Sequence, residues 1–115
     1  MKNKKPTRYF SKIQENHVAK LIGGKTTPNS GATKFIKGDV LKNDTDNSWL
    51  IECKTCTTSK NSFSIKKEWL TSTKKQAFEQ GKLFYALAFN YGPDQENYYI
   101  IDEKKFKEII NADND

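Results

Sequence analysis

The sequence is poor in the residues that build disulfide-linked or zinc-bound scaffolds. Among its 115 residues it has two cysteines, Cys53 and Cys56, and one histidine, His17. A single C-x-x-C with one histidine does not complete the four-ligand set of a structural zinc site, and the two thiols lie too close together to frame a disulfide scaffold. The cysteines therefore favour a reducing compartment. We interpret both thiols as incidental and His17 as a half-buried packing residue.

Long apolar runs are missing as well. No stretch approaches the roughly 18 consecutive apolar residues that span a bilayer, and the first ten residues, MKNKKPTRYF, lack the apolar segment of a secretory signal. We expect a cytoplasmic protein without a membrane partner, located in the host cytoplasm if a phage encodes it. The length suits one domain, residues 1–115, in which the lysine-rich residues 1–7 form a flexible basic arm.

Positive charge is concentrated in one part of the chain. Residues 1–67 carry fourteen Lys or Arg against five Asp or Glu, whereas residues 68–115 carry six against nine. A basic half of this kind attracts polyanions because binding releases condensed counterions. Nucleic acid is therefore the leading class of partner, although solvated surface lysines explain the same composition.

The apolar spacing predicts three helices and four or five strands. The first helix begins near Arg8 and ends at Gly23 and Gly24, with Phe10, Ile13, His17 and Leu21 as its apolar stripe, widened by Val18 and Ile22. Further along the chain we expect strands at 35–42 and 48–55, a helix at 65–80 with Ser64 as N-cap, strands at 83–90 and 98–101, and a last helix at 102–112 capped by Asp102, with a short extra strand near 25–27.

The run LFYALAFN at 83–90 is almost wholly apolar, as in a strand that is covered on both faces, and we place it at the centre of the sheet. Strands that alternate with helices favour an α/β protein with a mixed sheet flanked by helices.

Asp39, Glu52 and Lys54 are the residues on which a function can be based. Residues two apart on a strand point to the same face, so Glu52 and Lys54 project together, and a hairpin would bring Asp39 to that face. Carboxylate oxygens are the hard ligands that Mg²⁺ prefers, and a lysine beside them can stabilise charge on a phosphoryl group. A surface ladder of salt bridges is the alternative reading.

The context favours the metal site over the salt-bridge ladder. Glu52 and Lys54 end the apolar run that starts at Trp49, and a buried strand does not accept ionised groups without a partner or a ligand. Glu15 lies at the flank of the first helical stripe, where it can face the sheet. Lys66 and Lys67 begin the second helix and add positive charge nearby.

The order of these motifs resembles that of the PD-(D/E)xK nucleases. The order is a helix with Glu15, a glycine-rich turn, Gly38-Asp39, Glu52-Cys53-Lys54 and a helix opening Ser64-Ile65-Lys66-Lys67. Within these nucleases the chain is most similar to Holliday junction resolvase-like proteins of the archaeal and phage type, from about residue 8 to residue 101. Gly38 stands where the family name places proline. The resemblance implies a restriction-endonuclease-like core, Mg²⁺ or Mn²⁺ as cofactor, a role in DNA recombination and a homodimer.

Carried over by residue, the resemblance implies that Asp39 and Glu52 bind the metal together with Glu15 and the backbone carbonyl of Cys53. Lys54 would position and activate the attacking water, and Ser30 would approach DNA from the loop after the first helix. We expect further DNA contacts from basic residues, namely Lys4, Lys5, Arg8, Lys34, Lys37, Lys60, Lys66 and Lys67.

The sequence thus predicts a metal-dependent endonuclease, or phosphodiester hydrolase, that resolves branched DNA. Two alternatives stay open. One is another nuclease with the same chemistry, of nicking, flap or restriction type. The other is a DNA-binding module that keeps the fold without turnover.

Overall fold

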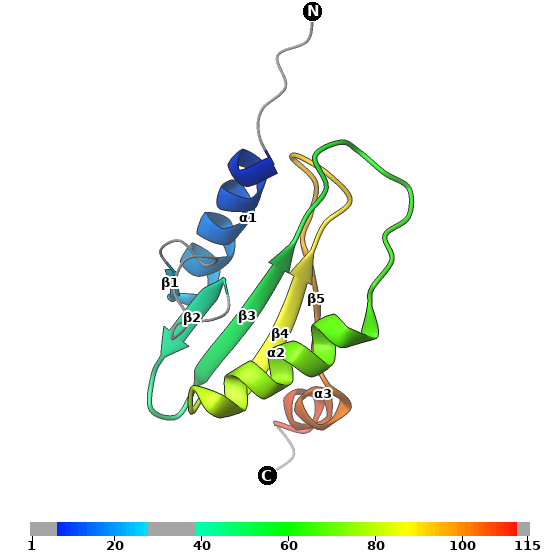
Figure 1. Ribbon diagram of the computed structural model, residues 1–115. Helices are drawn as coiled ribbons and strands as arrows, with labels where there is room; N and C mark the ends of the chain where they lie inside the picture. Colours follow the sequence, from blue (N-terminus) through cyan, green and yellow to red (C-terminus); the bar gives the residue numbers. More distant parts are fainter. Residues whose placement is uncertain (1–6, 28–38, 113–115) are drawn as a thin grey trace, which may run out of the picture.

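The computed structural model describes residues 7–27 and 39–112 (Figure 1). These residues form an α/β structure, as the sequence predicts, with three helices and a five-stranded mixed sheet. In chain order the elements are α1 (Thr7–Ile22), β1 (Lys25–Thr26), β2 (Val40–Asn43), β3 (Ser48–Lys54), α2 (Lys67–Glu79), β4 (Phe84–Phe89), β5 (Tyr98–Ile100) and α3 (Glu103–Ile110).

The strands follow one another in the sheet in their order along the chain, β1-β2-β3-β4-β5. Antiparallel pairing joins β1 to β2, β2 to β3 and β4 to β5, while β3 and β4 are parallel. A parallel pair needs a crossover connection, which α2 supplies. In this order the middle strand is β3. The expectation that 83–90 forms the sheet centre is wrong by one strand, although β4 is an interior strand with neighbours on both sides.

The two faces of the sheet pack against different helices. On one face, Val18 and Ala19 of α1 form the core with Val40, Ile51 and Ala88. Side chains alternate along a strand, so the neighbours of Ile51 in β3 and of Ala88 in β4 face the opposite side of the sheet. On that side α2 contacts both strands, and it crosses them in Figure 1. That second layer contains the fully buried Leu50 and Leu87 of the strands and the buried Thr73 and Ala77 of α2.

The two glycines after α1 are each required for a different reason. Gly23 has a φ of 72°, the left-handed conformation that glycine adopts at helix ends. At Gly24 a Cβ atom would lie 2.6 Å from the carbonyl oxygen of Leu41, so only glycine lets β2 come this close.

The apolar stripe predicted for α1 packs on the sheet through Val18 and Ile22 only, and its centre lies on the outer side of the helix. Its buried residues are Gln14, Glu15, Val18 and Ala19, whereas Ile13 is 52% exposed and Leu21 63% exposed. His17 is exposed as well, which overturns its interpretation as a half-buried packing residue. Two polar side chains take the inward positions because, as described below, each has an electrostatic or hydrogen-bonding role at the end of β3.

Some element boundaries differ from the expected ones. Helix α2 begins two residues later than expected. Its N-cap is Lys66, whose side chain makes no capping hydrogen bond, so the expected cap Ser64 is wrong. Strand β2 begins at Val40, and residues 35–38 of the expected strand lie outside the described residues. Asp102 caps α3 as expected, because its side chain accepts a hydrogen bond of 2.8 Å from the backbone N–H of Lys105.

None of the helices in residues 7–27 and 39–112 has the length and apolar character that a membrane crossing requires.

The orientation of α1 can be tested by two substitutions on the same helix. Val18→Ala should lower the free energy of unfolding by about 2 kcal/mol, because Val18 is fully buried and its loss leaves a cavity. Leu21→Ala should change it by no more than about 0.5 kcal/mol, since Leu21 is mainly exposed. Urea unfolding at low protein concentration measures both. Equal losses, or a larger loss for Leu21→Ala, would show that α1 packs through the other face.

Candidate active site

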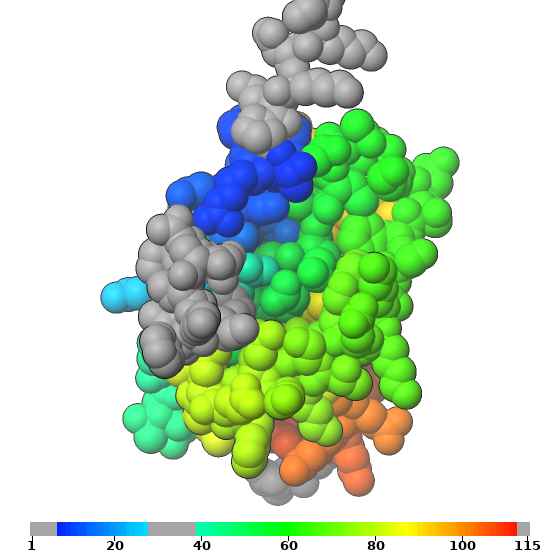
Figure 2. Space-filling model, viewed as in Figure 1, coloured from blue at the N-terminus to red at the C-terminus, as the bar shows by residue number. Residues whose placement is uncertain are grey.

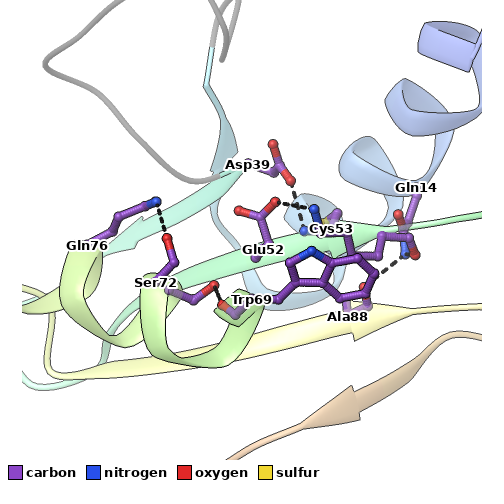
Figure 3. Close-up of polar contacts among 10 residues, drawn as sticks. Gln14, Asp39, Glu52, Cys53, Trp69, Ser72, Gln76 and Ala88 are labelled. Carbon is purple, nitrogen blue, oxygen red and sulfur yellow. Dashed lines mark hydrogen bonds and ion pairs between the residues drawn. The ribbon is translucent and has the colours of Figure 1, made fainter. Parts of the chain in front are cut away.

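The register of β2 and β3 places Asp39, Glu52 and Lys54 on one face of the sheet. Val40 pairs with Ile51 in antiparallel orientation, so Asp39, one residue before β2, lies opposite Glu52. Lys54 follows Glu52 by two residues and shares its face. Figure 3 shows Asp39 and Glu52 near each other above the strands, with Trp69 of α2 beside them. The expected convergence of these three side chains is therefore what the structure has.

Backbone hydrogen bonds hold Asp39 at the start of β2. Its N–H donates to the carbonyl oxygen of Ile51 over 3.3 Å, and its own carbonyl accepts from the N–H of Thr27 over 3.1 Å. The carboxylate oxygen Oδ2 accepts a hydrogen bond of 2.8 Å from the backbone N–H of Cys53. One oxygen is thus used to orient the side chain against β3, which directs the carboxylate toward Glu52.

Glu52 sits in an environment that disfavours its charge. Burial, followed by the negative charge of Asp39, raises the pKa of Glu52 to about 7, and the ammonium group of Lys54 only partly opposes this shift. The side chain is 22% exposed. Near neutral pH the carboxyl group of Glu52 is therefore divided between its protonated and ionised forms. A cation could displace the proton and bind the resulting carboxylate.

Lys54 has two partners, Glu52 and Trp69. Its Nζ lies 3.4 Å from Oε2 of Glu52 and 4.5 Å from the centroid of the Trp69 ring. Nζ of Lys66 lies 5.8 Å from the same centroid. An aromatic ring face attracts an ammonium group without neutralising it, so Trp69 can hold Lys54 even when Glu52 is engaged elsewhere.

Glu15 approaches from α1, on the other side of the sheet. It is 5% exposed, which confirms that it faces the sheet. Burial and then the charge of Asp39 raise its pKa, while Arg8 and Lys12 lower it. Glu15 is thus electrostatically coupled to Asp39, but it does not share the face of Glu52 and Lys54.

The chemistry of the donors fits a hard divalent cation better than a soft one. Burial, Asp39 and Glu15 raise the pKa of the Cys53 thiol, so this side chain stays protonated and is a poor metal ligand. The carboxylates of Asp39 and Glu52 carry like charges close together, and a divalent cation bound between them would offset their repulsion. Within 7–27 and 39–112, no three His, Cys, Asp or Glu side chains are grouped so that they could hold a metal ion. Ligation by Glu15 and by the Cys53 carbonyl stays a prediction.

Gln14 is a residue of the site that the sequence reasoning missed. It is 3% exposed, and its Nε2 donates to the carbonyl oxygens of Lys54 (2.8 Å) and Ala88 (3.3 Å) and to Oδ1 of Asn97 (3.0 Å). Gln14 thereby ties α1 to the ends of β3 and β4 directly behind the site. A polar residue next to Glu15 and one turn before Val18 was the available signal.

Helix α2 borders the site on the face of the sheet that carries Glu52 and Lys54. Ser72 and Gln76 lie one and two turns after Trp69, and Nε2 of Gln76 donates to Oγ of Ser72 over 3.1 Å. Figure 3 shows both on the side of α2 that is close to Glu52. In Figure 2 the green surface of β3 is visible between α1 and α2, so the site opens on this face of the molecule.

The expected DNA contacts can be located only in part. Lys4, Lys5, Ser30, Lys34 and Lys37 lie outside the described residues. The others are exposed: Arg8 in the first turn of α1, Lys60 in the 55–66 loop, Lys66 as the N-cap of α2 and Lys67 as its first residue. These four residues come from three segments, and a role for them in DNA binding stays a prediction.

Comparisons with known proteins give no family to which this geometry can be assigned. No family model, no curated protein and no solved structure matches the chain.

The raised pKa of Glu52 has a consequence for stability. The folded chain binds this proton more tightly than the unfolded chain, whose pKa is near 4.5. The stabilisation is therefore complete below that pH and is lost as the pH rises through about 7. Without divalent cations, we expect the free energy of unfolding to fall by on the order of 1 to 3 kcal/mol from about pH 5 to about pH 8. Urea titrations at several pH values measure this change.

Glu52→Gln is the control for this pH dependence, because glutamine keeps the shape and cannot ionise. The variant should lose most of the slope and keep the smaller part that comes from Glu15, whose pKa is raised as well. Parallel curves for wild type and variant would contradict the assignment of the shift to Glu52.

The contact between Lys54 and Trp69 can be measured by a double-mutant cycle. The unfolding free energies of Lys54→Met, Trp69→Leu and the double variant should give a coupling energy of about 0.5 to 1 kcal/mol. The matched control is the same cycle with Lys66→Met, because Lys66 lies farther from the ring. A coupling that is absent for Lys54, or no larger than that for Lys66, would remove Trp69 as its partner.

Proposed function

We propose that this protein is a metal-dependent endonuclease that hydrolyses phosphodiester bonds in DNA. The observation that carries the proposal is the close grouping of Asp39, Glu52 and Lys54, in which burial and the charge of Asp39 raise the pKa of Glu52 to about 7. Perturbed acids of this kind concentrate at functional sites. A simple surface salt bridge does not account for two carboxylates that destabilise each other beside one ammonium group.

Each residue has a definite task in this proposal. Asp39 and Glu52 would hold a divalent cation, which would supply Lewis-acid chemistry by polarising the phosphoryl oxygens and making nearby water more acidic. Lys54 gives up its link to Glu52 and turns toward the phosphate, where it stabilises the negative charge that develops on the oxygens. Trp69 limits the space that the freed ammonium group can explore. Glu15 adds negative charge behind Asp39.

The substrate and the class of nuclease rest on the resemblance described above. The likeness of Asp39, Glu52 and Lys54 to the D…ExK residues of the PD-(D/E)xK nucleases supports DNA as the substrate, Mg²⁺ or Mn²⁺ as the cofactor, and branched DNA as the favoured form. The excess of basic residues in 1–67 agrees with a polyanionic substrate. The sheet order β1-β2-β3-β4-β5 with α2 as crossover is compatible with a restriction-endonuclease-like core.

The test is a cleavage assay with Mg²⁺ on four-way junctions, flaps and linear duplexes. We expect wild type to cut the junction in paired strands. Asp39→Asn, Glu52→Gln and Lys54→Ala should each lower the rate by about 100-fold or more, as the loss of one charge-stabilising group does in other enzymes. Lys54→Ala should keep most of the DNA affinity, measured by fluorescence anisotropy, because one phosphate contact is a small part of the total.

Asp44→Asn is the matched control, because Asp44 is an exposed carboxylate in the turn between β2 and β3 that pairs with Lys42. It should cut at the wild-type rate. If wild type cuts none of the substrates with Mg²⁺ or Mn²⁺ yet binds them with an affinity that falls steeply with salt, the protein is a binding module and the nuclease proposal fails. Cutting of flaps or duplexes alone would reassign the substrate within the same chemistry.

A further inference from the structure

Five aromatic side chains gather at the end of the sheet where β3 and β4 finish. Phe89 of β4 pairs with Lys54 of β3 and with Tyr98 of β5. Paired residues of neighbouring strands point to the same face, so these three share the face that carries Glu52. The 55–66 loop and the β4–β5 loop leave the sheet at this end (Figure 1). The aromatic strip, as we call it, consists of Phe63, Trp69, Phe89, Tyr91 and Tyr98.

Ring contacts connect the aromatic strip from the candidate active site to the strand β5. The ring centroid of Phe63 lies 6.1 Å from that of Trp69 and 5.4 Å from that of Phe89. Phe89 in turn contacts Tyr98, with 5.7 Å between the centroids. Nζ of Lys54 lies 4.5 Å from the centroid of the Trp69 ring. The strip therefore begins beside the proposed catalytic lysine.

The aromatic strip is open to solvent. Tyr98 is 46% exposed, and the other four members are half-buried, so each side chain keeps part of its surface accessible. A ring with an accessible face can stack on a nucleic-acid base, whichever base it is, because every base has a π-face. The strip also lies where β3 and β4, the parallel pair, both reach their carboxyl ends, which is where open α/β sheets bind their ligands.

Lysines border the aromatic strip on two sides. Besides Lys54, Lys66 lies near Trp69, with 5.8 Å between Nζ and the ring centroid. Lys60 lies next to Tyr91, because its backbone N–H donates a hydrogen bond of 2.8 Å to the carbonyl oxygen of Tyr91. Lys60 and Lys66 are exposed. Positive charge beside accessible rings is the combination with which proteins hold single-stranded nucleic acid.

The acidic residues of the β4–β5 loop border the other face of the sheet. Asp94 and Glu96 line a groove of about 720 Å³ on the α1 side. Ile13 and Leu21 of α1 line the same groove. These two acids therefore do not stand between the lysines and the aromatic strip, and the surface around the strip suits a polyanion.

We propose that the aromatic strip binds unpaired bases of a DNA strand, one phosphate of which lies at Lys54. The position of that phosphate rests on the proposed nuclease function. The proposal names the feature of branched DNA that the site recognises, namely bases without a partner at a branch point or in a flap.

The spacing of the rings favours separated bases over a duplex strand. Contacting ring centroids in the strip are 5.4 to 6.4 Å apart. A strand within duplex DNA advances by only roughly 3.4 Å per nucleotide. Bases that lie on successive rings are therefore unstacked from one another, which a single strand permits and a duplex does not.

The test is DNA binding by the full chain in EDTA, where no metal-dependent cleavage occurs, measured by fluorescence anisotropy. The probes are a labelled oligothymidine of about 12 nucleotides, an abasic strand with the same number of phosphates, and a duplex of the same length. Wild type should bind the oligothymidine about 10-fold or more tightly than the abasic strand, because only the oligothymidine has bases to stack.

Tyr98 and Tyr99 provide a matched pair of variants, because they are neighbours on β5 whose side chains face opposite sides of the sheet. Tyr98→Ala should weaken binding of the oligothymidine about 5-fold or more and leave binding of the abasic strand unchanged. Tyr98→Phe keeps the ring and should bind like wild type, as should Tyr99→Ala. Unchanged thermal unfolding of the variants will show that they fold.

The emission of Trp69 gives a second measurement. In the variant Trp49→Phe, Trp69 is the only tryptophan that remains. Saturating oligothymidine should quench its emission through stacking, whereas the abasic strand should leave most of it unchanged. Equal quenching by both strands would contradict stacking on the strip.

Equal affinity for the oligothymidine and the abasic strand would overturn the proposal in favour of phosphate contacts alone. Equal losses in Tyr98→Ala and Tyr99→Ala would show that the strip is not the binding surface. A chain that cuts DNA without distinguishing the two strands would disprove this inference and leave the nuclease function intact. A chain that distinguishes them but cuts nothing would support the strip and overturn only the nuclease function.

Discussion

The antiparallel register of β2 and β3 is the constraint on which the candidate site depends. Pairing of Val40 with Ile51 sets Asp39 opposite Glu52, and the pleat then places Lys54 on the same face. A slip of one residue would turn Glu52 and Lys54 into the apolar core under α1 and bring Ile51 and Cys53 to the site. The fully buried Val40 and the nearly buried Ile51 oppose that slip, so the hydrophobic core fixes the geometry of the charges.

Burial and charge act against each other at this position. The protein encloses Glu52 beside Asp39, which makes the ionised form costly, and balances it only in part with Lys54. Such an arrangement contributes little to the stability of a fold. In a site that binds a cation or a phosphate it is useful, because the weak link between Glu52 and Lys54 is easily broken by the ligand. The polar residues on the buried face of α1 belong to the same arrangement. Gln14 fixes the end of β3, and Glu15 adds to the negative field around Asp39.

Helix α1 shows how an amphipathic pattern can mislead. Its sequence has apolar residues on two sides, Val18 and Ala19 on one and Ile13 and Leu21 on the other. The periodicity identifies a helix correctly but does not say which side packs on the sheet. The smaller side chains lie inward because α1 approaches β2 and β3 closely, next to the glycine contact at Gly24. The larger ones remain outside and line the groove. The same ambiguity applies to α3, whose apolar residues are mainly exposed.

Local chemistry in the sequence was enough for the helices, the strands, the caps at Gly23 and Asp102, and the sharing of a face by Glu52 and Lys54, because these depend on periods of two or about four residues and on single-residue conformations. The residues of the candidate site were also visible, since carboxylates after an apolar strand are unusual. The middle position of β3, the inward side of α1, the hydrogen bonds of Gln14 and the contact of Trp69 with Lys54 were decided only by tertiary structure. Each depends on which surfaces meet across separations of many residues, and a linear pattern contains no distance between them.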